Sequence, residues 1–349
     1  MKITKRTVNS GQGEISLFRI ENTSGASVEL SSLGAGISSV IVPDKFGELA
    51  EVALGYANPA DYMADGPCMG KVPGRYANRI AKGHLEIEGK TYQLNINNGP
   101  NALHGGPTGF QNHIWDAEII PDGVRFTYVS KDGEENYPGT LTVKAEYTWS
   151  EDNVLNLDLK ATTDAPTVVN LTNHAYFNLE GADSGSVLNH KLRIKASRYL
   201  PTDETQIPTG EFAPVAGSPM DFTSPKEIGI DINKDFEPLK IGKGYDHCWA
   251  LDNWEKGSLM EGAVVLAAPS SGRMLTISST QPGVQIYTGN WLDGSPLNKS
   301  GVSYKDYEGV AIELQGFPDA PNKPSFPSQK INPGEEYKET IRYAFSVEK

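Results

Sequence analysis

The chain has 349 residues, of which 38% are hydrophobic and 21% charged, so it has the composition of a globular protein with a large core and not of a disordered chain or a coiled coil. Its 31 basic and 44 acidic residues give a formal net charge of -13, and no stretch combines a block of basic residues with aromatic ones. Nucleic acid and anionic membrane are therefore excluded as expected partners.

The N-terminal residues and the cysteines bear on the location of the protein. Residues 1–30 contain no apolar run of the length that a signal peptide needs, and no later stretch approaches a membrane span. Cys68 and Cys248 fit neither a redox motif nor a zinc-ligand spacing, which favours two buried thiols. We expect a cytoplasmic protein.

The first hundred or so residues give one helix signal and two candidate polar loops. Asn58 before Pro59 is typical of a helix cap and first helical residue, so a short helix is predicted there. Asn78 and Arg79 lie in GRYANRI, where they equally well brace a loop. His104 precedes two glycines that permit a tight turn, and this window alone favours a histidine that bonds its own loop.

The clearest pattern in the chain has a period of two. In residues 140–149 apolar residues alternate with polar ones, and after the polar turn 150–153 the alternation resumes in residues 155–161. The two segments are predicted to form a hairpin.

The window NLTNHAYFNL, residues 170–179, predicts a strand with two different faces. Alternation places Leu171, Ala175 and Phe177 on an apolar face and His174 with its polar neighbours on the other. A polar wall of amides, an imidazole and an aromatic ring is the kind of surface that binds sugars. An ordinary solvated strand face explains the pattern as well.

The next segment gives a second helix signal and a weak site signal. Ser224-Pro225-Lys226-Glu227 reads as a capping box, which predicts another short helix. Asp246 and His247 follow in KGYDHCWAL, where the carboxylate equally suits a turn and the imidazole a structural role.

Strand patterns continue to the C-terminus. Gln285 and Tyr287 share a strand face after a Gln-Pro-Gly turn. In GVAIELQGF, residues 309–317, the apolar residues occupy one face, so Glu313 projects from the other. A glutamate on a rigid strand becomes a useful base in a concave, partly dry setting, and is otherwise a surface residue. Residues 341–347 alternate again.

Many short antiparallel strands, 36 Gly and 23 Pro, and few helix signals predict an all-β fold. The chain shows no composition break, linker, repeat or low-complexity tract. We therefore expect one large antiparallel β-sandwich that forms a single domain over residues 1–349.

Several kinds of chemistry have no motif here. The sequence lacks an H-E-x-x-H motif, a His-x-His pair and an EF-hand spacing, so no metal site is indicated. A phosphate-binding loop and a G-x-S-x-G nucleophile elbow are also missing. Acid, base and polar recognition groups remain.

Taken together and in order, these windows resemble the aldose 1-epimerase (galactose mutarotase) family over nearly the whole chain. The matching stretches are GRYANRI at 74, NNGPNALHGG at 97, NLTNHAYFNL at 170, PMDF at 219, YDHCWAL at 245, QPGVQIYTGNWLDG at 281, IELQGFPDAPN at 312 and PGEEY at 333. The resemblance implies a galactose mutarotase-like sandwich with a sugar cleft on a concave sheet face.

The resemblance also assigns site residues. It implies that Glu313 and His174 are catalytic. It implies further that sugar hydroxyls are held by Asn78, Arg79, His104, Asp246 and Gln285. Cys248-Trp249 departs from the Asn-Phe that many relatives carry after Asp-His, which leaves the shape of the wall there open.

An anomer inverts when the ring opens, which requires removal of the C1 hydroxyl proton and protonation of the ring oxygen. We hypothesise that Glu313 is the base and His174 the acid, with His104 and Arg79 stabilising charge that develops on the oxygens. No cofactor is needed. At ordinary pKa values near 4.3 and 6.5 the glutamate is ready at neutral pH, and a carboxylate such as Asp246 would help to protonate the histidine.

Other functions stay open at this stage. The same fold serves a non-catalytic carbohydrate-binding protein, a glycoside hydrolase using Asp246 and Glu313, or a sugar-phosphate 1-epimerase, which would need basic groups in the cleft. The expected partner is a small-molecule sugar such as galactose or glucose. We expect a monomer or a weak homodimer.

Overall fold

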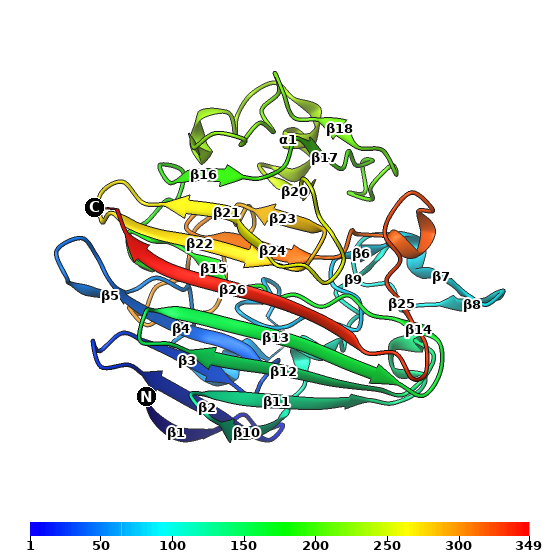
Figure 1. The fold of residues 1–349 in the computed structure, drawn as a ribbon, viewed down its shortest axis with the longest axis horizontal. Coiled ribbons are helices and arrows are strands. Elements are labelled where there is room, and N and C mark those ends of the chain that lie inside the picture. The colour runs from blue at the N-terminus through cyan, green and yellow to red at the C-terminus, as the bar shows by residue number, and fades with distance from the viewer. Residues whose placement is uncertain (64, 349) are drawn as a thin grey trace.

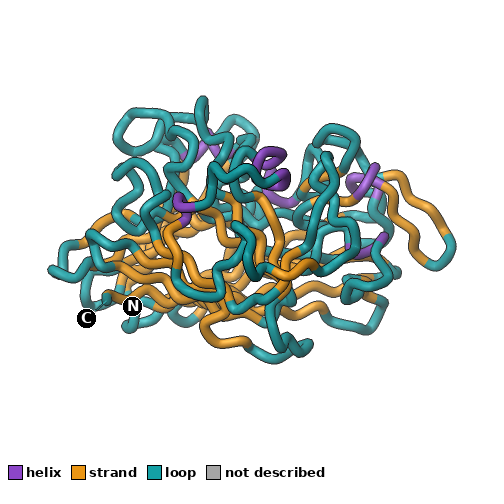
Figure 2. Tube along the Cα trace, turned by 90° about the horizontal axis from the view of Figure 1, so that it is seen from above, coloured by secondary structure: helices purple, strands orange, loops and turns teal. Residues whose placement is uncertain are grey.

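The computed structural model describes residues 1–63 and 65–348 and consists mainly of antiparallel strands joined by long loops (Figure 1). This confirms the predicted all-β sandwich. Helices are short turns scattered among the loops (Figure 2). They are η1 (Pro59–Tyr62), η2 (Ala81–Gly83), η3 (Phe110–Asn112), η4 (Glu134–Asn136), η5 (Ile228–Ile230), α1 (Glu237–Gly242) and η6 (Ala320–Asn322).

One layer is a nine-stranded sheet, in which the C-terminal strand β26 lies between β13 and β22 (Figure 1). In spatial order its strands are β10 (Asp116–Ile120), β11 (Gly123–Ser130), β12 (Leu141–Trp149), β13 (Val154–Thr163), β26 (Tyr337–Val347), β22 (Arg273–Ser279), β21 (Met260–Ala267), β16 (Lys191–Ile194) and β19 (Lys226–Glu227). The predicted hairpin is β12 with β13, paired from Leu141 with Thr163 to Trp149 with Leu155.

The remaining large sheets pack against the nine-stranded one. A six-stranded sheet has the order β15 (Tyr176–Phe177), β24 (Val310–Gln315), β23 (Gly283–Tyr287), β20 (Asp246–Ala250), β17 (Arg198–Tyr199) and β18 (Ala213–Pro214). A five-stranded sheet has the order β1 (Lys2–Asn9), β2 (Glu14–Glu21), β3 (Ser27–Ser31), β4 (Gly36–Pro43) and β5 (Leu49–Glu51). Buried side chains of all three sheets, such as Ile20, Leu157 and Ile312, belong to one hydrophobic core.

Three two-stranded ladders carry the loops at the edge of this sandwich. They are β6 (Arg79–Ile80) with β9 (Ala102–Leu103), β7 (His84–Ile87) with β8 (Lys90–Gln93), and β14 (Thr167–Val168) with β25 (Lys330–Ile331). The first ladder matters most for function, because it brings residues 78–79 beside residue 104.

The two helix predictions have different outcomes. The Asn58 side chain accepts a hydrogen bond from the Ala60 N–H at 3.1 Å, so the cap is confirmed, although the segment it starts is a 3₁₀ turn. The capping box at Ser224 is wrong. Lys226 and Glu227 instead pair with β16 as the edge strand β19, because sheet pairing outweighs the local cap signal.

The structure also bears on the cysteines and on membrane insertion. Cys68 and Cys248 are both buried and free, as the sequence predicted. Within the described residues, no helix is long and apolar enough to cross a membrane.

Candidate active site

Glu313 is held rigidly on β24, which hydrogen-bonds to β15 on one side and β23 on the other. Val310, Ile312 and Leu314 point into the core, so Glu313 projects from the opposite face, as the alternation predicted. Its side chain is nonetheless 2% exposed. The glutamate is therefore desolvated and is not a surface residue.

His174 reaches the same place from an irregular segment, which corrects the predicted strand over residues 170–179. Only Tyr176–Phe177 forms a strand, because the backbone of His174 bonds across to another loop: its N–H donates to the Lys71 carbonyl at 2.9 Å, and its carbonyl accepts from the Gly70 N–H at 3.0 Å. The apolar alternation still holds, since Leu171 and its partners lie in the core. The polar face, expected to be solvated on the simpler interpretation, is buried.

Glu313 and His174 face each other, with Oε1 of the carboxyl 3.5 Å from Nε2 of the imidazole. Burial raises the pKa of Glu313 well above its ordinary value, with the charge of Asp246 acting in the same direction and that of Arg79 against it. Burial lowers the pKa of His174 to about 4, although the charge of Asp246 acts to raise it. Because the pKa of the carboxyl lies above that of the imidazole, a single proton on this pair resides on Glu313.

This distribution corrects the expectation drawn from ordinary pKa values. Asp246 does favour the imidazolium form of His174, as expected, but the loss of solvation outweighs its effect. For the same reason Glu313 favours its protonated form. Low solvation disfavours both the carboxylate form of Glu313 and the imidazolium form of His174.

His104 supplies a neutral hydrogen-bond donor beside this pair. Its ring packs edge-on against that of His174, with 5.3 Å between the ring centroids. The Asn78 N–H donates to its Nδ1 at 3.1 Å, which leaves the proton of the neutral ring on Nε2. Burial, together with the neighbouring His174, lowers the pKa of His104 well below its ordinary value, so the ring stays neutral.

The glycines after His104 fix the loop that presents it. His104 has a φ of +52° and Gly105 a φ of +82°. A Cβ on Gly105 would lie 1.9 Å from the carbonyl oxygen of Gly74. The sequence expectation of a close backbone approach at this turn is therefore confirmed.

Arg79 and Asp246 form a second polar group in the wall. The Arg79 Nη2 lies 3.5 Å from Asp246 Oδ2, and Gln285 Nε2 donates to Asp246 Oδ1 at 2.7 Å. Burial raises the pKa of Asp246, but Arg79 and the Gln285 hydrogen bond outweigh it and bring the pKa below its ordinary value. Asp246 is thus ionised at neutral pH.

These groups surround one cavity of about 370 Å³. It is lined by Gly66, Pro67, Asn78, Arg79, Asn98, Leu103, His104, His174, Tyr176, Gln206, Asp246, Tyr287, Trp291 and Glu313. The sequence-predicted residues are therefore brought together from distant parts of the chain. Of these residues only Gln285 does not line the cavity. It lies opposite Glu313 in the pairing of β23 with β24, and its side chain donates a hydrogen bond to Asp246.

Sequence reasoning missed several of the lining residues. Gln206 bonds both Arg79 and Asp246, Asn98 accepts from Arg79 Nε at 3.1 Å, and Trp291 is 66% exposed at the cavity. All three lie outside regular strands, where no periodicity marks a side chain as facing a site. Only the folded loops reveal them.

The departure at Cys248 and Trp249 affects packing and not the cavity. Both side chains are buried, and neither lines the cavity. Trp249 packs against Phe222, and its indole N–H donates to the Met220 carbonyl at 2.9 Å. The departure from the relatives at these two positions therefore changes packing in the core and leaves the cavity lining unchanged.

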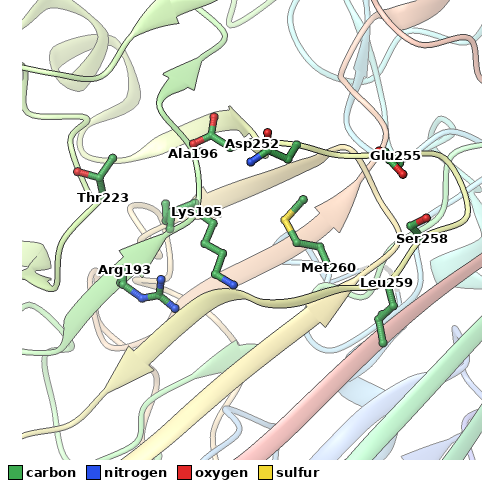
Figure 3. A pocket seen from close by; sticks show the side chains of 11 residues that line it. Arg193, Lys195, Ala196, Thr223, Asp252, Glu255, Ser258, Leu259 and Met260 are labelled. Carbon is green, nitrogen blue, oxygen red and sulfur yellow. The ribbon is translucent and has the colours of Figure 1, made fainter.

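A second depression, of about 410 Å³, lies at β16 and the loop before β21 (Figure 3). Its two cations are occupied, since Arg193 donates to the Gly262 carbonyl at 3.2 Å and Lys195 to the Glu261 carbonyl at 2.6 Å. Its lining residues include no histidine and none of the residues predicted to be functional.

Known proteins similar to this chain are described as galactose mutarotases or aldose 1-epimerases. The sequence model of the family described as aldose 1-epimerase matches residues 16–344. Galactose mutarotase from Sus scrofa is 41% identical over 338 residues, which cover 97% of this chain and 96% of the relative. Aldose 1-epimerase from Escherichia coli K12 is 38% identical over 335 residues, covering 95% of each.

The fold has a counterpart among solved structures. The crystal structure of an aldose epimerase homologue from C. elegans superposes with a TM-score of 0.87 at 30% identity, covering 99% of this chain and 100% of that one. The similarity thus extends over nearly the whole of both chains.

Proposed function

The chain belongs to the aldose 1-epimerase family and interconverts the α and β anomers of aldoses, and we propose that Glu313 and His174 perform the two proton transfers of this reaction. The observation that carries the proposal is the desolvated carboxyl–imidazole contact of 3.5 Å inside a sugar-sized cavity. Glu313 removes the proton from the C1 hydroxyl, and His174 protonates the ring oxygen.

The proton count of this step is balanced. Before ring opening the pair is carboxylate and imidazolium; afterwards the carboxyl holds the proton taken from O1, and the imidazole is neutral. The aldehyde then rotates about C1–C2, and the same groups act in reverse. Each transfer contributes about 10²- to 10⁴-fold to the rate.

Burial makes these two charge states similar in energy. Desolvation favours the neutral arrangement of the opened sugar, whereas the charge of Arg79 favours the Glu313 carboxylate and that of Asp246 favours the His174 imidazolium. A bound sugar adds hydroxyl groups that solvate the ion pair. The neutral His104 donates to the oxygen on which negative charge develops.

The remaining predicted residues hold the sugar. Asn78, Arg79 and Asp246 present amide, guanidinium and carboxylate groups to hydroxyls, and Gln285 fixes the orientation of Asp246. Tyr176 and Tyr287 provide aromatic surface for the apolar face of the pyranose. Galactose and glucose are the proposed substrates, supported by the galactose mutarotases among the relatives.

Two other chemistries fit the cavity less well. Among the described lining residues Arg79 is the only lysine or arginine, and it is already bonded to Asn98 and Gln206, which argues against a sugar phosphate. The hydrolase alternative needs Asp246 as a partner carboxylate, but Asp246 is held by Arg79 and two glutamines.

The domain organisation, oligomeric state and cellular location of the protein are also proposals. We propose a single domain, since strands from β2 to β26 share one core, and a monomer or weak homodimer. The cytoplasm is the proposed location, supported by two cysteines that remain free thiols.

Polarimetry of freshly dissolved aldoses tests the proposed function. We expect the protein to accelerate the optical-rotation decay of α-D-galactose and α-D-glucose and to release no nitrophenol from nitrophenyl galactosides. Sugar binding without acceleration would indicate a carbohydrate-binding protein, and nitrophenol release a hydrolase. Acceleration confined to sugar phosphates would contradict the proposed substrate.

A further inference from the structure

Gln206 connects the cation and the anion of the cavity wall. Its Oε1 accepts a hydrogen bond from Arg79 Nη2 at 2.7 Å, and its Nε2 donates to Asp246 Oδ2 at 2.7 Å. Both contacts are shorter than the direct approach of the guanidinium to the carboxylate, which is 3.5 Å. The amide thus stands between two opposite charges and is oriented by both.

A tight turn holds Gln206 in this place. Its φ is +63°, a left-handed conformation that is unfavourable for a residue with a Cβ. The Asp203 side chain accepts hydrogen bonds from the N–H groups of Thr205 at 2.8 Å and Ile207 at 3.1 Å, and the Gln206 N–H donates to the Asp203 carbonyl at 3.0 Å. These hydrogen bonds maintain the strained backbone conformation, which directs the Gln206 side chain towards Arg79 and Asp246.

Arg79 and Asp246 are each held by two amide side chains, and Gln206 is the one that bonds both of them. Asn98 fixes Arg79 through Nε, and Gln285 fixes Asp246 through Oδ1. In the part of the chain that the structure describes, Nη1 of Arg79 has no hydrogen-bond partner, so it is available to a sugar hydroxyl.

We propose that Gln206 is a positioning residue for sugar binding, an inference that rests on the proposed function. It keeps Arg79 and Asp246 from closing into a direct two-point ion pair, the geometry that guanidinium and carboxylate groups prefer. Such a pair would consume the donors and acceptors that meet the sugar hydroxyls. Because both polar ends of the amide are engaged, Gln206 acts through its two neighbours.

The variant Gln206→Ala tests this role. We expect KM for α-D-galactose to rise about tenfold, the effect of one sugar hydroxyl losing its hydrogen bond to Arg79 or Asp246, while kcat stays within about twofold. Gln206 bonds neither Glu313 nor His174, and the variant keeps the charges of Arg79 and Asp246 that act on this pair, which is why the two constants should separate. An unchanged KM, or a fall in kcat as large as the rise in KM, would overturn the proposal.

The isosteric variant Gln206→Glu tests it independently of folding losses. When the introduced carboxyl is protonated it can accept from Arg79 and donate to Asp246; when ionised it repels Asp246. Its pKa is expected to be raised by that carboxylate, against the effect of Arg79. His247, next to Asp246, adds no charge in the range tested, because burial lowers its pKa to about 4. We expect the KM of this variant to fall towards the wild-type value between pH 8 and 5.5, with wild-type KM flat. A KM independent of pH contradicts the proposal.

Glu204→Gln is the matched control, because Glu204 is exposed in the same loop and does not line the cavity. The substitution removes a charge from the loop and leaves the cavity unchanged. It should keep wild-type KM and kcat; a change like that of the alanine variant would show an effect of the loop alone and overturn the role of Gln206. Wild-type protein without mutarotase activity would refute the proposed function. Active wild type with unaffected Gln206 variants would refute this inference alone.

Discussion

Burial decides how the proton is shared between Glu313 and His174. Both side chains are nearly inaccessible, so each is pushed towards its neutral form. Sequence alone gave the residue types and, through the family resemblance, their pairing. The expected charges, a carboxylate at Glu313 and a partly protonated His174, were wrong. Ordinary pKa values describe solvated groups, and nothing in a linear sequence shows desolvation.

The pH profile follows from this proton. The pair needs one proton: a second is taken up only near the His174 pKa of about 4, and the last is lost when the pH exceeds the raised pKa of Glu313. We expect kcat/KM, measured by polarimetry and corrected for the spontaneous reaction, to stay high well below pH 6 and to fall on the alkaline side. An acidic limb near the ordinary histidine value of about 6.5 would contradict this assignment.

At the scale of elements, regular strands were predictable and the loops between them were not. The alternation of β12, β13, β24 and β26 identified strands and their buried faces, because a period of two has a single geometric meaning. Residues 170–175 show the limit: their alternation gave the correct faces, but the backbone bonds to the loop 70–77 instead of to a neighbouring strand.

The turn at Gly105 provides a test of how a loop presents His104. In Gly105→Ala the new Cβ would collide with the Gly74 carbonyl and would adopt a strained φ. We expect the free energy of unfolding to fall by about 3 kcal/mol, from overpacking and backbone strain, with a loss of mutarotase activity.

Gly99→Ala is the control for this prediction, because Gly99 also has a positive φ, +54°, but open space around its Cβ position. Only strain of about 1 kcal/mol is expected there. Equal destabilisation of the two variants in urea unfolding would show that steric contact with Gly74 is unimportant.

At the scale of the whole molecule, one hydrophobic core joins the nine-stranded sheet to the sheets that carry the site. The fold class was predictable from strand spacing, composition and the family resemblance together. The order of the strands was not, since β26 pairs with β13 and β22, segments far apart in the sequence. The roles of the seven site residues and the single domain remain predictions.

The buried carboxyl group of Glu339 makes the stability of the whole fold depend on pH. Burial raises its pKa to about 7, although Thr280 donates a hydrogen bond to it. Because the folded state holds this proton more tightly than the unfolded chain, the contribution of Glu339 to stability is lost as the pH rises to about 7. We expect Glu339→Gln to be more stable than wild type by about 1 to 2 kcal/mol at pH 8, after a discount for partial exposure, and equal near pH 4.

Urea unfolding at the two pH values measures this difference, with the exposed neighbour changed in Glu336→Gln as the control. The control should show no comparable gain. A Glu339→Gln variant whose advantage is the same at pH 4 and pH 8 would contradict the buried-carboxyl explanation.

The central claim is that one carboxyl and one imidazole exchange protons with the C1 hydroxyl and the ring oxygen of a bound pyranose. Turnover of α-D-galactose by Glu313→Gln and His174→Asn, with sugar affinity measured alongside by calorimetry, tests it most directly. We expect kcat to fall by about 10²- to 10⁴-fold in each variant, with binding retained. Wild-type turnover in either variant would contradict the claim.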